Sequence, residues 1–247
     1  MIVIPSIDLR GGHCVRLLQG DFAAETRYPL DPLQLAARYH SLGARWLHVV
    51  DLDGARDGTL ANRAIIADIV SALPGLKVQV GGGVRSRGVV AELLQAGVAR
   101  VAVGSAAVES PGEVRGWIDE FGAERVCLAF DIGMDPAGQP LLKTRGWRES
   151  TALSLWNAVD NFLPAGLLHV LCTDIARDGA LAGPNIALYS EATRRHPGIQ
   201  WQASGGVSNA ADLAALSSSR AAAAISGKAL LEGRISMEEL QPYLRGA

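Results

Sequence analysis

The sequence has few of the residues that mark disulfide-bonded or nucleic-acid-binding proteins. It contains 3 cysteines, Cys14, Cys127 and Cys172, and none of them lies in a CxxC pair. Isolated cysteines in odd number indicate reduced thiols and favour a cytoplasmic protein. The 23 basic residues, nearly all arginine, are interspersed with 25 acidic ones, and the formal net charge is −2. No basic stripe is present, so we expect no nucleic-acid partner.

Long apolar runs are also absent. No stretch approaches the roughly 18 consecutive apolar residues that a membrane span needs. The first ten residues, "MIVIPSIDLR", carry neither a basic segment nor a small-residue cleavage site, which are the features of a signal peptide. We therefore expect a cytoplasmic protein without membrane contact.

What is present is a regular alternation of two kinds of segment. Short, almost wholly apolar runs, typical of parallel strands buried on both faces, alternate with amphipathic helical segments. The runs are 3–8, 45–52, 77–83, 100–105, 126–132, 167–175, 199–206 and 221–227, and clear helical segments are 32–44, 87–99, 154–165 and 210–219. Eight such runs predict a (β/α)₈ TIM barrel, with an open doubly wound sheet as the alternative. No linker interrupts the alternation, so we expect a single domain over residues 1–247.

Internal repeats favour the barrel. The segment "HVVDLDGARDGTL" from His48 matches "HVLCTDIARDGAL" from His169, 121 residues later. Likewise "GGGVRS" matches "SGGVSN" and Asp8 matches Asp131, each 123 residues apart. The sequence therefore predicts two (βα)₄ half-barrel repeats, about 1–122 and 123–247. In such a barrel Asp8 and Asp131 end opposite strands and point into one mouth.

The two aspartates are candidates for catalysis. Catalytic residues of TIM barrels lie at the C-terminal ends of the strands. The structural alternative is that each aspartate caps the next helix. Their paired positions favour function, because opposed carboxyls in a small site separate in pKa and can serve as base and acid.

Glycines recur where the third, fourth, seventh and eighth strands should end. Backbone N–H groups of such turns, together with helix N-termini, can bind a phosphate. One set comprises Gly82, Gly83, Gly104 and Ser105, and the other comprises Gly205, Gly206, Gly227 and Lys228. Two sets on opposite sides of the mouth predict a ligand with a phosphate at each end.

Several motifs resemble one family. The segments "IPSIDLRGGHCVRLLQGD", "VQVGGGVRS", "TDIARDGALAGPN" and "ASGGVS" closely resemble the HisA family, the phosphoribosylformimino-5-aminoimidazole carboxamide ribotide isomerases of histidine biosynthesis. The resemblance covers nearly the whole chain. It implies a two-fold repeat barrel that converts a bisphosphorylated aminoaldose ribotide to the aminoketose by an Amadori rearrangement. It also implies a small-molecule substrate, no metal and no cofactor, and we expect a monomer.

The resemblance also implies roles for individual residues. Asp8 resembles the general base that removes the sugar C2 proton, Asp131 the general acid that protonates the ring oxygen, and Thr173 the residue that supports the acid. Asp174, one position later, should point away from the mouth. Substrate contacts are implied for Arg85, Arg145, Trp147, Gly179 and Arg16.

Two further positions have a structural interpretation. His48 and His169 could carry protons, but they lie early in their strands, which favours satisfied core histidines. Ser226 stands where relatives generally have an aliphatic residue, and it could narrow the second phosphate site.

Three other functions stay open at this stage. The sister cyclase of the pathway shares the aspartates and glycines, but Arg16 and "LLQGD" follow the isomerase pattern. A non-catalytic phosphosugar-binding barrel would tolerate damage to one carboxylate, and both are intact. A dual-substrate isomerase acting also on phosphoribosylanthranilate would use Arg145, two residues before Trp147, to bind the anthranilate carboxylate. We expect a single physiological substrate, because the other motifs resemble the single-substrate isomerases.

Overall fold

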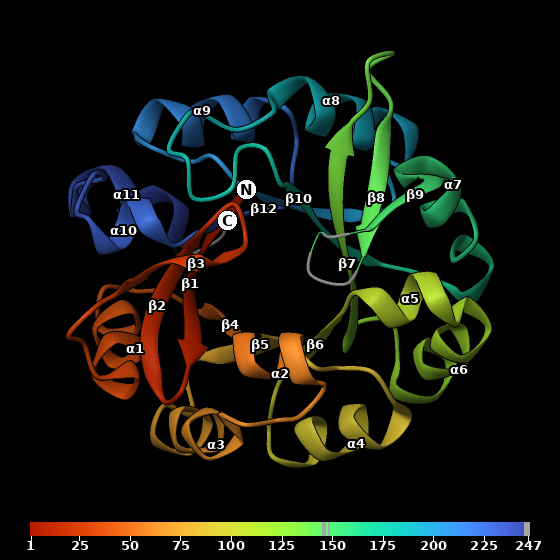
Figure 1. The fold of residues 1–247 in the computed structure, drawn as a ribbon. Helices are drawn as coiled ribbons and strands as arrows, with labels where there is room; N and C mark the ends of the chain where they lie inside the picture. The colour runs from red at the N-terminus through yellow and green to blue at the C-terminus, as the bar shows by residue number, and fades with distance from the viewer. Residues whose placement is uncertain (145–146, 148, 245–247) are drawn as a thin grey trace.

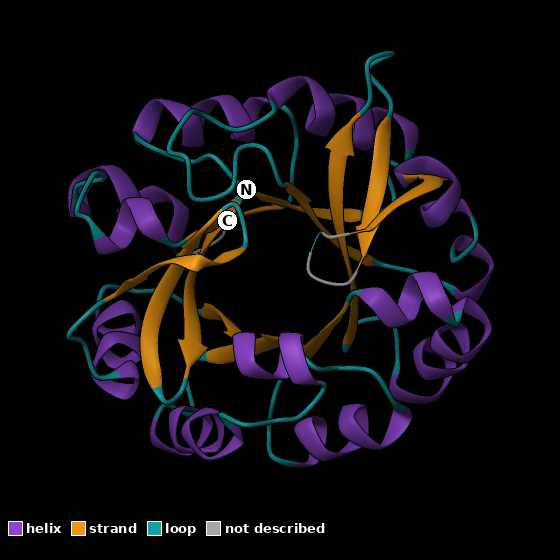
Figure 2. Ribbon diagram, in the orientation of Figure 1, coloured by secondary structure: helices purple, strands orange, loops and turns teal. Residues whose placement is uncertain are grey.

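The computed structural model describes residues 1–144, 147 and 149–244. Within this part of the chain, eight parallel strands form a closed ring with helices outside it (Figures 1 and 2). The barrel strands are β1 (Ile2–Arg10), β4 (Trp46–Asp51), β5 (Lys77–Gly81), β6 (Arg100–Val103), β7 (Val126–Met134), β10 (His169–Asp174), β11 (Gln200–Ser204) and β12 (Ala223–Ser226). The ring closes where β1 pairs with β12 along residues 2–5 and 223–226. The predicted barrel is confirmed, and the open sheet is excluded.

Helices cover the outer surface of the ring. They are α1 (Pro32–Ser41), α2 (Leu52–Asp57), α3 (Arg63–Ala72), α4 (Arg87–Gln95), α5 (Ser105–Glu109), α6 (Pro111–Phe121), α7 (Leu155–Asp160), the 3₁₀ helix η1 (Leu163–Ala165), α8 (Ile186–Arg195), α9 (Ala210–Ser218), α10 (Lys228–Leu231) and α11 (Met237–Leu244). The start of α4 is fixed by Ser86, whose hydroxyl accepts from the Val89 N–H, and that of α9 by a capping box of Asn209 and Asp212. None of the helices in the described ranges has the length and hydropathy that crossing a membrane requires.

Two antiparallel ribbons rise from the barrel, and the sequence analysis missed both. β2 (His13–Leu18) and β3 (Asp21–Arg27) extend β1, while β8 (Pro140–Thr144) and β9 (Glu149–Ser154) extend β7. Figure 1 shows them on opposite sides of the ring, red and green. β8 ends at Thr144 and β9 begins at Glu149, on either side of Trp147. Mixed polar sequences such as β3, which is largely exposed, lack the apolar pattern from which strands are recognised.

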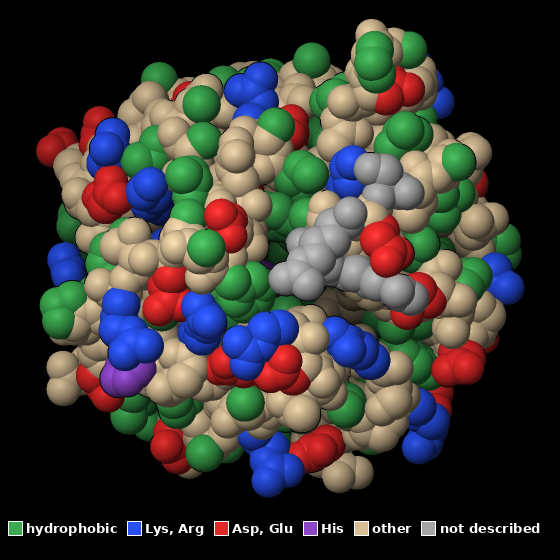
Figure 3. Space-filling view, in the orientation of Figure 1, with side chains coloured by type: hydrophobic (Ala, Val, Ile, Leu, Met, Phe, Trp, Pro, Cys, Tyr) green, Lys and Arg blue, Asp and Glu red, His purple; other side chains and the backbone are tan. Residues whose placement is uncertain are grey.

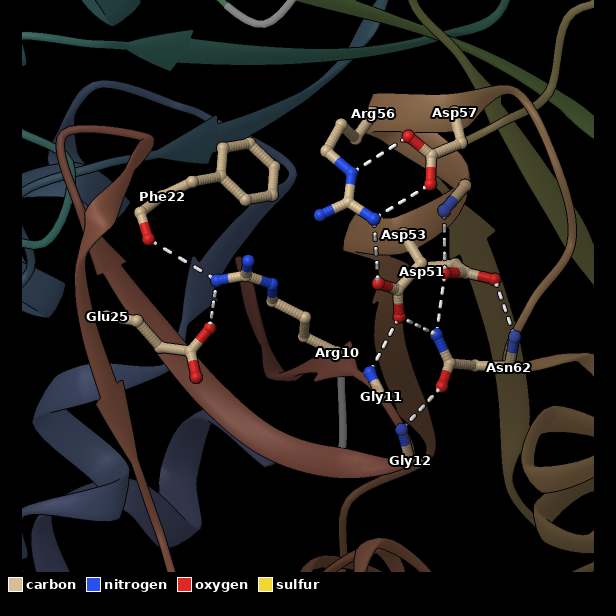
Figure 4. Close-up of polar contacts among 11 residues, drawn as sticks. Arg10, Gly11, Gly12, Phe22, Glu25, Asp51, Asp53, Arg56, Asp57 and Asn62 are labelled. Carbon is tan, nitrogen blue, oxygen red and sulfur yellow. Dashed lines mark hydrogen bonds and ion pairs between the residues drawn. The ribbon is translucent and has the colours of Figure 1, made fainter.

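The turn between β1 and β2 is fastened to the first half of the barrel (Figure 4). Gly11 N–H donates to Asp53 Oδ2 at 2.7 Å, and Gly12 N–H donates to Asn62 Oδ1 at 3.0 Å. Asn62 is itself held, because its side-chain amide donates to Asp51 Oδ1 at 2.7 Å. These bonds fix the base of the ribbon that carries Arg16.

The hydrophobic core lies mainly between the strands and the helices. A smaller cluster fills the inside of the barrel, made of Ile4, Cys127, Leu171, Ala223 and Ile225. The upper end of the barrel interior, toward the C-terminal ends of the strands, is lined by polar, glycine and apolar residues. The core leaves room for a ligand at this end.

Candidate functional site

A cavity of about 840 Å³ opens at the C-terminal ends of the barrel strands. Every predicted site residue that the structure describes lines it: Asp8, Gly82, Gly83, Arg85, Gly104, Ser105, Asp131, Trp147, Thr173, Gly179, Gly205, Gly206, Gly227 and Lys228. Arg145 lies outside the described residues. On this face basic and acidic side chains are intermixed (Figure 3). Over the described ranges, no group of three or more His, Cys, Asp or Glu side chains could hold a metal ion.

Asp8 forms an ion pair with Arg16. β1 and β2 pair with Asp8 opposite Val15, and Arg16 follows Val15 near the end of β2, where its long side chain reaches the carboxylate. Arg16 Nη1 donates to Asp8 Oδ2 at 2.6 Å, and Nη2 donates to the Ser6 carbonyl. A Cβ at Gly227 would overlap the Arg16 guanidinium, so this group also lies against the last glycine. We expected Arg16 to contact substrate, and the structure places it on the proposed base.

Asp131 accepts its side-chain hydrogen bonds from neutral groups, and Lys143 is its partner in register on β8. On the adjacent strand Thr173 is its partner in register, and the Asp131 carboxyl accepts hydrogen bonds from the Thr173 hydroxyl and the Trp147 indole. Burial raises the pKa of Asp131 above its ordinary value, although these two hydrogen bonds act against the rise. Desolvation of the carboxyl therefore favours its protonated form more than exposure to water would.

Neither aspartate is a helix cap. Asp8 and Asp131 lie inside β1 and β7, and both strands run on into ribbons. The cap of α2 is instead Asp51, whose Oδ1 accepts from the Gly54 N–H at 2.9 Å. The capping interpretation of Asp8 and Asp131 is therefore wrong.

Sequence analysis missed a third aspartate, Asp178. It follows β10, lines the cavity and lies near Asp8, Asp131 and Arg16. The pKa of Asp178 is raised to about 7, mainly by burial and also by the charges of Asp8 and Asp131, while the charge of Arg16 acts against the rise. The sequence signal for Asp178 is the repeated "ARDG" motif, which places an aspartate shortly after a barrel strand in both halves of the chain. In the first copy Asp57 is exposed and pairs with Arg56 at 2.8 Å, so the repeat alone does not reveal the difference.

Asp174 points away from the cavity, as predicted. It is 2 % exposed, and its carboxylate accepts from Asn185 Nδ2 at 2.8 Å and from the Ala176 N–H at 3.2 Å. Asp174 therefore shapes the loop after β10 and does not face a ligand.

The two histidines do not occupy matching places. Ser6 pairs with His48 in β1 and β4, whereas Ala129, 123 residues beyond Ser6, pairs with Leu171 in β7 and β10. When the strands are aligned on Asp8 and Asp131, His48 corresponds to Leu171, so the 121-residue match with His169 is out of register. His169 lies at the barrel floor, where Arg100 Nη2 is 2.8 Å from its Nε2. His48 lines the cavity.

The glycines approach neighbouring backbone closely. Gly83 and Gly206 have φ values of 76° and 93°, and a Cβ on Gly83 would lie 2.7 Å from the Thr59 carbonyl oxygen. A Cβ on Gly206 would overlap the Gly183 carbonyl group. Only glycine fits these turns. Their backbone N–H groups remain at the cavity wall, although the helices after Gly104 and Gly227 have only 5 and 4 residues and contribute little dipole.

The remaining predicted contacts lie around the mouth. Lys228 Nζ donates to the Gly179 carbonyl at 2.9 Å, and the exposed Arg85 donates to the Ala55 carbonyl at 2.6 Å. Trp147 packs against Gly20 of the opposite ribbon, since a Cβ added to Gly20 would lie 2.5 Å from the Trp147 ring. Ser226 lines the cavity and is 2 % exposed.

Sequence comparisons agree with this architecture. The family model described as "Histidine biosynthesis protein" matches residues 2–236. A protein of Pseudoalteromonas atlantica is 46% identical over 238 residues, covering 96% of this chain and 97% of its own. Proteins of Alteromonas mediterranea and Vibrio cholerae are 44% identical over the same shares. All three are named 1-(5-phosphoribosyl)-5-((5-phosphoribosylamino)methylideneamino)imidazole-4-carboxamide isomerase. Because the family model and these relatives span nearly the whole chain, this protein belongs to the histidine biosynthesis protein family.

Proposed function

We propose that this protein is the isomerase that converts the bisphosphorylated aminoaldose ribotide of histidine biosynthesis into the aminoketose. The observation that carries the proposal is the pair Asp8 and Asp131, which line one cavity in opposite surroundings. One carboxylate pairs with a guanidinium, and the other is buried among neutral donors. An aldose-to-ketose rearrangement needs this combination, because one group must remove a proton and another must supply one.

In the proposed mechanism Asp8 acts as the general base on the open-chain sugar. Asp8 takes the C2 proton of the protonated Schiff base, which gives an enaminol. As the enaminol becomes the product ketone, its C2 hydroxyl loses a proton and C1 gains one, which completes the Amadori rearrangement. The ion pair with Arg16, 2.6 Å long, holds one oxygen of the Asp8 carboxylate in place. Arg16 thus acts through Asp8 as a positioning residue.

Two carboxyls can provide the acid that opens the ribose ring. Asp131 has its pKa raised by burial and is supported by Thr173. Asp178 has a pKa of about 7 because it is buried near Asp8 and Asp131. Because the charge of Asp131 acts on Asp178, the two carboxyls titrate as one system.

The glycine turns would bind the two phosphates. Gly82, Gly83 and Gly104 lie on one wall of the cavity, and Gly205, Gly206 and Gly227 on the opposite one. Lys228 adds a cation to the second set, and Arg85 adds one at the rim of the first. The 123-residue spacing of these sets supports two half-barrel repeats, about 1–122 and 123–247, within a single domain.

Trp147 would cover the flat imidazole ring between the phosphates. It lines the cavity from the ribbon opposite Gly20, and its indole donates to Asp131. A single physiological substrate, a monomeric state and a cytoplasmic location remain parts of the proposal. The names of the relatives favour the isomerase over the cyclase and over a non-catalytic barrel.

The test is turnover by the purified protein. Incubation with the bisphosphorylated aminoaldose should give the aminoketose, which chromatography detects. A substrate that lacks either terminal phosphate should show a sharply raised KM. Absence of aminoketose, with circular dichroism showing a folded barrel, would overturn the isomerase assignment. An unchanged KM for both truncated substrates would overturn the two-phosphate site.

A further inference from the structure

A chain of buried polar side chains crosses the barrel below the cavity. Gln79 on β5 and Gln202 on β11, which are 0% and 2% exposed, pair through both amide groups: each Nε2 donates to the other Oε1, at 2.9 and 3.1 Å. Arg100 on β6 lies on one side of this pair and His48 on β4 on the other. Neither glutamine lines the cavity, but His48 does.

Arg100 determines which way the Gln79 amide points. Arginine has only donors, so the atom that faces it must be the amide oxygen. Arg100 Nη1 donates to Gln79 Oε1 at 3.4 Å, and Arg100 is itself held by a bond from its Nε to the Glu124 carbonyl at 2.9 Å. The Gln79 NH₂ group is therefore turned toward His48 and Gln202.

The orientation of Gln79 fixes the tautomer of His48. Gln79 Nε2 lies 3.2 Å from His48 Nδ1 and donates to it, so Nδ1 carries no proton. Burial and, to a smaller extent, the charge of Arg16 lower the pKa of His48 to about 4, although a hydrogen bond with the Gln79 backbone acts against the fall, so the ring is neutral near pH 7. The single ring proton must then reside on Nε2, the other nitrogen of a side chain that lines the cavity.

His48 lies close to the site of proton abstraction. It pairs in register with Ser6, two residues before Asp8 on the neighbouring strand, and alternate strand residues face the same side. A neutral donor at this level can bind an oxygen on which negative charge develops while Asp8 takes the proton from carbon. A neutral imidazole with a lowered pKa donates such a bond without giving up its proton.

We propose that His48 donates a hydrogen bond from Nε2 to an oxygen of the open-chain sugar, and that Gln79, oriented by Arg100, holds the proton on that nitrogen. The donor role rests on the proposed isomerase function. The tautomer assignment does not, because it concerns the ligand-free protein. His48 is thus a substrate-contacting residue, Gln79 is a positioning residue, and neither gains or loses a proton in the reaction.

The tautomer is tested without substrate. Long-range ¹H–¹⁵N spectra of histidine-labelled protein at neutral pH should show His48 with an unprotonated Nδ1 and a protonated Nε2. A protonated Nδ1 in the wild-type protein would overturn the assignment. Because this readout needs no turnover, it stands apart from a failure of the isomerase function, which the wild-type assay reveals separately.

The positioning role is tested by a matched pair of variants. Gln79→Met and Gln202→Met remove the same amide pair, but only Gln79 contacts His48. Gln79→Met should lower kcat about tenfold with little change in KM, and should mix the two His48 tautomers, whereas Gln202→Met should lower kcat less than about threefold. Equal losses of kcat in the two variants would show that the pair is merely structural.

The donor role is tested at His48 itself, so the test does not depend on the folding of the glutamine variants. The amide nitrogen of glutamine can occupy the place of Nε2, and that of asparagine cannot. His48→Asn should lower kcat about 10²-fold, as loss of a donor to a developing oxyanion does, and His48→Gln should retain most of the activity. Equal, complete loss in both variants would indicate proton transfer by His48 and overturn the proposal.

Discussion

Asp8 and Asp131 lie 123 residues apart on opposite strands of the barrel, yet their surroundings differ in charge. Beside Asp8 the ribbon of β2 supplies Arg16, whose guanidinium donates to the carboxylate at 2.6 Å. Beside Asp131 the neighbours are Thr173 and Trp147, which donate hydrogen bonds without carrying a charge. The strands point both carboxyls into the same cavity, and residues of the ribbons and neighbouring strands surround each carboxyl with different groups.

The difference explains how a near-symmetric barrel can perform an asymmetric reaction. A cation stabilises a carboxylate, as a base requires, while burial among neutral donors raises the pKa of an acid. The second side also has Asp178, whose pKa is raised to about 7. Its counterpart in the "ARDG" repeat, Asp57, is exposed on α2 and pairs with Arg56. Residues outside the repeated strand positions, such as Arg16 and Asp178, therefore distinguish the side proposed to act as base from the side proposed to act as acid.

The largest expected effect comes from removing each carboxyl in turn. Asp8→Asn and Asp131→Asn should each lower kcat by about 10² to 10⁴, because a positioned base or acid is lost, and neither should unfold the protein. Steady-state turnover with thermal melting by circular dichroism measures both. If either variant keeps kcat within about threefold of wild type, the assignment of that aspartate fails.

Removing the neighbours of the two carboxyls should give unequal effects. Arg16→Met deprives Asp8 of a charge-assisted bond and should lower kcat about 10- to 100-fold, with partial rescue in Arg16→Lys. Thr173→Val removes a neutral bond to Asp131 and should lower kcat only about threefold to tenfold. Parallel kcat measurements on the three variants compare the two sides. A greater loss in Thr173→Val than in Arg16→Met would reverse the proposed roles.

The glycines should separate folding from function. At Gly206 a Cβ would overlap the Gly183 backbone at a φ of 93°, so Gly206→Val should destabilise the protein by about 1–3 kcal/mol through strain alone. At Gly227 a Cβ would meet only the Arg16 guanidinium, a flexible side-chain end. Gly227→Ala should therefore displace Arg16 and lower kcat while the unfolding free energy, measured in urea, changes little. Equal destabilisation in the two variants would contradict this distinction.

The smallest expected effect is on the pH dependence of stability at Asp178. Its folded pKa of about 7 lies above the ordinary aspartate value of 3.8, so between these values the folded protein holds an extra proton. The resulting stabilisation is present at low pH and lost as pH rises through about 7. Asp178→Asn carries no such proton, and its melting temperature relative to wild type should rise between about pH 5 and about pH 8. A constant difference would indicate that Asp178 is not protonated in the native protein.

The barrel could be predicted from sequence because its strands are buried on both faces. Runs such as 126–130 are apolar throughout, and the strand ends carry glycine or aspartate. The ribbons could not be predicted in this way, since β3 is largely exposed and its pairing depends on how far β1 extends past the rim. The contact between Arg16 and Asp8 could not be predicted for the same reason, because it depends on the β1–β2 ribbon.

Repeat matching located the site and misplaced one residue within it. Asp8, Asp131 and the paired glycines keep the 123-residue spacing, so their common direction followed from sequence. The connections from β4 to α3 and from β10 to α8 have the same length, but the "ARDG" motif lies two residues nearer the strand in the second one, so matching on this motif paired His48 with His169 instead of Leu171. Asp178 was overlooked because its raised pKa comes from charges brought together only by folding.

The most direct test of opposite roles for the two sides of the mouth is the pH profile of kcat/KM between about pH 6 and about pH 9, which reports ionisations of the free enzyme. The acid side must hold a proton, and the pKa of Asp178 is about 7. We predict that wild-type kcat/KM falls as pH rises above about 7, and that Asp178→Asn shows a lower kcat/KM without this fall. A wild-type kcat/KM that stays level to about pH 9 would contradict the account, because no acid on that side would then be losing its proton.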